Sequence, residues 1–113
     1  MNAQHTKNAA PYNSPDIEQF GIDPELKACM AEVSAVLRRH KLEGRIGLEV
    51  LHDHFPVAAA EILYETHDAG KRELMLSPVQ RATVDPEKVF VSGWDPTTAR
   101  ALRICSSNFN CEL

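Results

Sequence analysis

Three short apolar runs in the middle of the chain constrain its fold more than any other feature. The runs lie between Gly44 and Pro78, and turn-forming residues separate them. Apolar runs of this length, with β-branched and aromatic residues between turn signals, are typical of strands rather than helices. We therefore expect three strands of a largely antiparallel sheet, over residues 45–55, 61–67 and 71–77.

A pattern of helical spacing precedes the strands. Asp23 is a favoured N-cap residue, and Pro24 after it suits the first helical position. Apolar residues then recur at steps of three and four positions, which places them on one face of a helix. Gly44 offers a C-terminal cap. The sequence predicts a helix over 24–42, with an apolar stripe that packs on the sheet and consists of Leu26, Met30, Val33 and Leu37.

The C-terminal part of the chain adds a fourth strand and one ambiguous segment. We expect the fourth strand at 88–92, around Val89-Phe90-Val91. Asp95-Pro96 repeats the cap-and-proline start, which favours a short closing helix over 97–105. The alternation of residues 102–105 favours a fifth strand instead. We prefer the helix and keep the strand as the alternative.

These elements predict a single α+β domain over residues 14–113. It has a long N-terminal helix packed on a largely antiparallel sheet of about four strands, and a short C-terminal helix. Residues 1–13 are small and polar. Such a segment buries too little apolar surface to offset its ordering entropy, so we expect a disordered N-terminal arm.

Length and charge exclude several classes of function. A chain of 113 residues can bury one core without disulfide or metal staples. The net charge of −4 argues against a nucleic-acid partner, because phosphate binding needs a clustered basic surface. No apolar stretch approaches the ~20 residues that span a bilayer, and the first residues lack the apolar core of a secretory signal. We therefore expect a cytoplasmic protein without a membrane partner, whose three cysteines stay reduced.

A plain hairpin at Asp68-Ala69-Gly70 would set the strand register. Glu65 would then lie opposite Glu73, and Leu63 opposite Met75. Because side chains alternate between the faces of a sheet, this register divides the strands into an inner and an outer face. The inner face and the helix stripe form the predicted core, which consists of Leu51, Ile62, Tyr64, Leu74 and Leu76 with Leu26, Val33 and Leu37.

The outer face carries an apolar patch with a charged rim in this register. Such patches are the usual appearance of a partner-binding surface. The predicted interaction surface consists of Leu48, Val50, Leu63 and Met75.

His52-Asp53-His54 is the one local pattern with the character of a metal site. On a strand, residues two positions apart project to the same side, with Cα atoms about 6.7 Å apart. Glu61 would join the two histidines from the neighbouring strand. Two histidines and one carboxylate form a ligand set for catalytic zinc or iron that leaves positions open for water. The predicted metal ligands are His52, His54 and Glu61, and two solvent-edge histidines are the alternative.

Three functions are compatible with these sequence patterns. The preferred hypothesis is a small, soluble, non-enzymatic binding or regulatory module that acts through the outer sheet face on a protein partner or a second copy. The alternative is a metal-dependent enzyme with one divalent ion, zinc or iron, at the two-histidine, one-carboxylate site. A thiol redox protein is the most distant hypothesis, because the chain has no CxxC pair.

Overall fold

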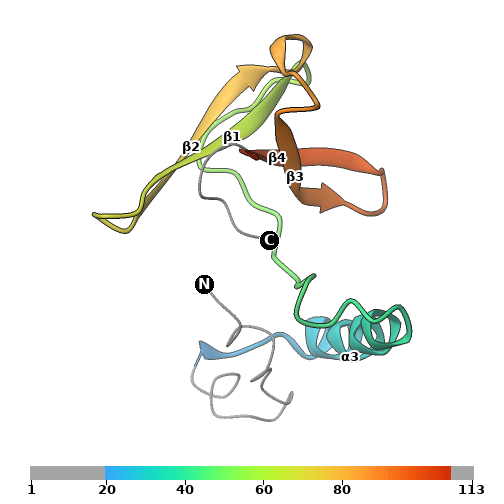
Figure 1. Cartoon of the computed structure of the whole chain (residues 1–113). Helices are drawn as coiled ribbons and strands as arrows, with labels where there is room; N and C mark the ends of the chain where they lie inside the picture. The colour runs from blue at the N-terminus through green and yellow to red at the C-terminus, as the bar shows by residue number, and fades with distance from the viewer. Residues whose placement is uncertain (1–19, 108–113) are drawn as a thin grey trace. The chain divides into compact units, whose positions relative to one another are not determined.

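The structure is a computed structural model that describes residues 20–107 (Figure 1). The chain divides into two compact units, with the boundary between Leu51 and His52. Among the described residues, the first unit contains one helix and the second a four-stranded sheet. The predicted α+β class is therefore confirmed. The predicted disordered arm, residues 1–13, lies outside the described residues, and the single domain over 14–113 stays a prediction.

Helix α3, Pro24–Arg39, begins where its cap signals place it. The backbone N–H of Glu25 donates to Asp23 Oδ1 at 2.9 Å, which satisfies one of the donors left open at a helix N-terminus. The helix has 16 residues and follows a 23-residue segment, so it is shorter than predicted and does not begin the chain. It is not long and apolar enough to cross a membrane.

The end of α3 corrects the predicted boundary. Lys41, not Gly44, takes the left-handed backbone conformation that stops the helix, with a φ of 58°. The N–H of Leu42 donates to the carbonyl of Leu37 at 2.8 Å, and that of Lys41 to Arg38 at 3.1 Å. These two bonds form the Schellman motif, which satisfies the last carbonyl groups of a helix.

The apolar stripe of α3 has the predicted spacing. Its members are half-buried, whereas the polar residues between them are mostly exposed. No residue of α3 is fully buried. The packing of this stripe on the sheet stays a prediction.

The sheet consists of two antiparallel hairpins joined by one parallel pair. Its strands follow the order β2-β1-β4-β3, so that β2 and β3 form the edges. Strands β1 and β4 are parallel, and the other two pairs are antiparallel. A short 3-10 turn, η1, follows β2. The strand bounds are Glu61–Asp68 for β1, Glu73–Gln80 for β2, Val89–Asp95 for β3 and Arg100–Ser106 for β4, and those of η1 are Arg81–Thr83.

The predicted strand over 45–55 is wrong. This segment contributes no strand to the sheet, and its ladder contact is an isolated bridge between Glu43 and Ile46. A strand needs a free edge to pair with, and β1 has none, because β2 occupies one side and β4 the other. The start of the next strand at Glu61 agrees with the prediction.

The predicted closing helix over 97–105 is also wrong, and the strand alternative is correct. Asp95 does not cap a helix: its Oδ1 accepts the N–H of Thr97 at 3.0 Å and the Thr97 hydroxyl at 2.7 Å. These bonds close a tight turn that ends at Ala99, whose φ is 57°. The chain then returns as β4 and pairs with β1 and β3 on its two sides.

The hairpin between β1 and β2 has a different register from the predicted one. Glu65 lies opposite Leu76, and Leu63 lies opposite Pro78. Residues 69–72 form the turn, in which Arg72 has a φ of 58°. The register is displaced by three positions because the turn includes Lys71 and Arg72. An odd displacement exchanges the two faces of β2 relative to β1.

The core lies where β1 and β4 are neighbours. Ile62 and Ile104 are 5% and 3% exposed, and Cys105 and Ser106 are buried beside them. Ile104 pairs with Tyr64, so Ile62, Tyr64 and Ile104 share one face.

Most of the other predicted core residues are not buried. Leu51 and Leu74 are 60% and 61% exposed, and Tyr64 and Leu76 are half-buried. The exchanged face of β2 explains Leu74, because its side chain lies on the side opposite Ile62.

Candidate functional site

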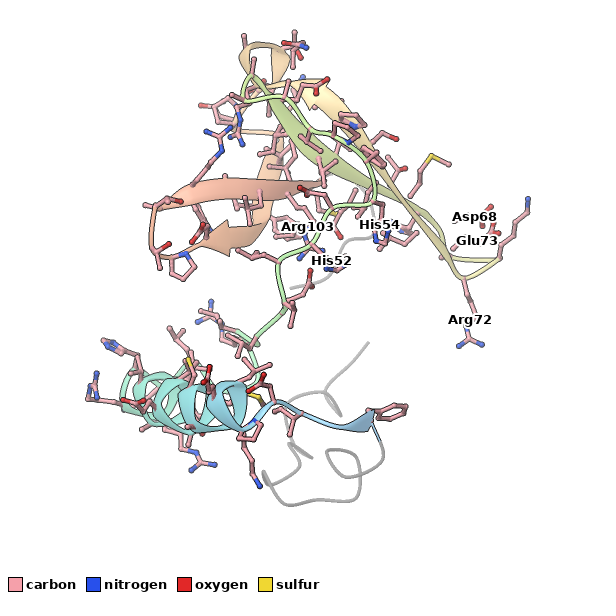
Figure 2. The ribbon with its side chains drawn as sticks, turned by 180° about the vertical axis from the view of Figure 1, so that it is seen from behind. His52, His54, Asp68, Arg72, Glu73 and Arg103 are labelled. Carbon is pink, nitrogen blue, oxygen red and sulfur yellow. The ribbon has the colours of Figure 1, made fainter. Side chains whose placement is uncertain are left out.

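His52 and His54 lie side by side, although no strand holds them. Their ring centroids are 4.9 Å apart, and the planes meet nearly at right angles, at 83°. Both residues belong to the irregular segment that leads into β1. Figure 2 shows the two rings in the same region as Arg103 of β4. The two histidines are therefore close together, as predicted, but they lie on an irregular segment and not on a strand.

Glu61 has a local structural role at the start of β1. Its Oε1 accepts the backbone N–H of Ala58 at 2.8 Å, which closes the turn before the strand. Within residues 20–107, no three His, Cys, Asp or Glu side chains form a group that could hold a metal ion. The three-ligand site of His52, His54 and Glu61 thus stays a prediction.

Arg103 lies on a face of the sheet that also carries polar side chains from β1 and β3. A Cβ atom at Gly93 would lie 3.0 Å from Arg103 Nε and 3.2 Å from its Nη2. Gly93 therefore leaves room for the guanidinium to lie against β3. On the same face, the hydroxyl of Ser92 donates to Glu65 Oε2. Three strands contribute to this group, which the sequence could not indicate without the pairing of β1 with β4.

Arg81 holds the parallel strands together. Its Nε donates to the carbonyl of Glu61 at 2.9 Å, and its Nη2 donates to that of Ala101 at 2.7 Å. Arg100 bonds the carbonyl of Ala59 at 2.5 Å. Burial lowers the pKa of Arg81, and the positive charge of Arg100 lowers it further. The bonds of both guanidinium groups to backbone carbonyls indicate a structural role for them.

The predicted interaction surface does not form one patch on the sheet. Leu63 is half-buried, and the register places it on the face opposite Met75. Leu48 and Val50, which are 52% and 64% exposed, belong to the first compact unit. Met75 is 63% exposed and is the member that the sheet presents most openly.

The far end of the first hairpin has less support than the rest of the sheet. Strand β4 pairs with β1 between Leu63 and Glu65, so beyond this point β1 and β2 have no other partner strand within residues 20–107. We call residues 66–75 the projecting hairpin, and Figure 1 shows its tip extending away from β4. Leu74 and Met75 in it are more than half exposed and lie on opposite faces.

Charged residues surround the tip of the projecting hairpin. Figure 2 shows Asp68, Arg72 and Glu73 there, and the N–H of Lys71 donates to Asp68 Oδ1 at 3.1 Å. Leu74 and Met75 thus lie next to a charged turn. The sequence contains the signal for this element, since the apolar run Leu74–Leu76 follows a turn. The exposure of Leu74 and Met75 in this run is shown by the structure.

The cysteines differ in state. Cys105 is buried and disulfide-bonded, whereas Cys29 is an exposed free thiol on α3. The expectation of three reduced cysteines is therefore wrong for Cys105.

Comparisons with known proteins identify no relative of this chain. No protein-family model, curated protein sequence or solved structure matches the chain.

Proposed function

We propose that this protein is a small non-enzymatic binding or regulatory module, and that it contacts a protein partner through the projecting hairpin. The observation that carries this proposal is the exposure of Leu74 and Met75, 61% and 63%, on β2, which has β1 as its one neighbour among the described residues. The preferred hypothesis from the sequence was binding through the outer sheet face. The register moves the proposed contact to the end of the hairpin.

A two-stranded hairpin with exposed apolar side chains is unfavourable in water. A two-stranded ribbon is marginally stable in water without a third element to cover it. A partner that covers Leu74 and Met75 removes apolar surface from water, which contributes about 25 cal/mol per Å². Methionine also adapts its shape to irregular partner surfaces. The exposed apolar surface and the adaptable methionine both favour the projecting hairpin as a binding element.

An environment-sensitive hydrophobic dye tests the proposal without a known partner. In dilute protein we expect the dye to fluoresce strongly, and we expect Leu74→Gln and Met75→Gln to remove most of this signal. Val36→Gln is the matched control, since Val36 is an exposed aliphatic residue on α3. Equal fluorescence in all four proteins would contradict binding through the projecting hairpin.

A second candidate function is metal-dependent catalysis at His52 and His54, with Glu61 as the carboxylate. The contact between the two imidazole rings favours it. In their neutral forms, two adjacent imidazoles can bind one divalent ion such as zinc or iron. An ion with open coordination positions would lower the pKa of a bound water and supply a nucleophile. Movement of Glu61 away from Ala58 would be required to complete the set.

Thermal unfolding with and without metal tests this second candidate. An ion that binds the folded state stabilises it by about 2.7 kcal/mol at one hundred times its dissociation constant. We expect zinc, iron(II) or manganese to raise the melting temperature, a chelator to reverse the rise, and His52→Ala to abolish it. His67→Ala is the control from β1. An unchanged midpoint, or an equal rise in His52→Ala, would contradict the metal site.

A further inference from the structure

We infer that the partner of the projecting hairpin is a second copy of this chain, paired through the free edge of β2 about a two-fold axis at Met75. The inference rests on the proposed function and names its partner. Among the described residues, β2 has a neighbouring strand on one side and none on the other. The free side presents backbone N–H and C=O groups to any strand that can align with it.

Symmetry restricts how two copies of β2 can pair. Two antiparallel strands of one sheet are related by a two-fold axis normal to the sheet, and this axis keeps each residue on its own face. Residues that oppose each other must also share a face. One residue of β2 must therefore lie directly opposite its own copy, with the axis midway between the two, and we name the axis by this residue.

Charge and proline exclude most of the possible centres. An axis at Glu73 would place two carboxylates directly opposite each other, which is unfavourable. An axis at any residue from Leu76 to Gln80 would bring Pro78 into the ladder, and proline has no N–H to donate. Two centres remain, Leu74 and Met75.

The neighbours of the axis decide between these two centres. An axis at Leu74 places the carboxylate of Glu73 opposite the apolar Met75 of the second copy. An axis at Met75 places Glu73 opposite Ser77, whose hydroxyl can donate to a carboxylate, and Leu74 opposite Leu76. Apolar residues then face apolar residues and polar face polar, so the geometry points to Met75.

The resulting assembly covers the two exposed apolar side chains of the hairpin, Leu74 and Met75. On one face, Leu74 and Leu76 of each copy form a four-membered apolar cluster, and on the other face the two Met75 side chains meet. Pairing spans residues 73–77 and ends before Pro78. Two four-stranded sheets become one continuous sheet with β3 at both outer edges.

Sedimentation of the full chain over a wide concentration range tests this assembly. We expect a reversible equilibrium between monomer and dimer. Met75→Lys would place two like charges at the axis, and it should weaken the dimer by at least about tenfold. Trp94→Lys is the matched control on the other edge strand, since Trp94 is 56% exposed; it should leave the dimer unchanged. Circular dichroism checks that both variants fold.

Cross-linking then tests the register. In a Cys29→Ser background, Met75→Cys places two thiols at the axis, where a short bis-maleimide should join the copies. In Gln80→Cys the two thiols would lie about 33 Å apart at ~3.3 Å per residue, and no product is expected. A product from Gln80→Cys and none from Met75→Cys would overturn the register.

The outcomes also separate this inference from the proposed function. A monomer at every concentration, or a dimer that Trp94→Lys breaks and Met75→Lys does not, overturns the pairing through β2. Dye binding that still depends on Leu74 and Met75 in such a monomer would leave the proposed function standing. If the dimer forms as inferred, dye fluorescence should fall as the protein concentration rises.

Discussion

Replacing Ile104 with alanine is expected to lower the free energy of unfolding of the sheet by about 2–5 kcal/mol. Ile104 is 3% exposed and lies on the central strand β4, so truncation leaves a cavity among its neighbours on β1 and β3. In dilute protein, Leu74→Ala should change the same free energy by less than about 0.5 kcal/mol, because the Leu74 side chain is already in water.

Denaturant unfolding of both variants measures this difference. The fluorescence of Trp94, the one tryptophan of the chain, reports on the sheet because it lies in β3. Ile62→Ala is a second core variant and should resemble Ile104→Ala. Equal losses in Leu74→Ala and Ile104→Ala would mean that Leu74 belongs to the core, and the assignment of faces would be wrong.

Local signals in the sequence located the starts of elements well. Asp23-Pro24 marks the first turn of α3, and Glu61 begins β1 as expected. Both signals act through bonds within a few residues, such as the bond from Glu25 to Asp23. The end of α3 was less predictable, since a lysine rather than a glycine takes the left-handed conformation there.

Pairing between distant segments could not be predicted from the same signals. The run at 46–51 has the composition of a strand, but β4 occupies the edge of β1 that this run would need. The cap-and-proline pair at Asp95 looks like a helix start and instead closes a turn. The pairing of β4 with β1 and β3 thus outweighs the local preference in both segments.

The candidate site shows the same difference between local signals and contacts of distant segments. The sequence indicated that His52 and His54 lie together, because they are close in the chain. It placed Leu63 and Met75 on one face, because the predicted turn omitted Lys71 and Arg72. Arg81 bonds residues 20 positions away in the chain, and Arg103 of β4 lies against Gly93 of β3. No local pattern in the sequence predicts these contacts.

The projecting hairpin should also differ from the rest of the sheet in its dynamics. In dilute protein, amides of residues 66–75 lack support from β4, so local opening should expose them readily. Amides of β1 and β4 near Ile62 and Ile104 should open only with the whole sheet. We expect exchange rates to differ by about 100-fold or more between the two groups.

Amide hydrogen exchange at two protein concentrations is the most direct test of binding through this hairpin. We expect fast exchange at residues 66–75 in dilute protein, and selective slowing at residues 73–77 when the protein is concentrated. Exchange near Ile104 should be the same at both concentrations and serves as the internal control. Uniform protection across both hairpins in dilute protein would contradict binding through the projecting hairpin.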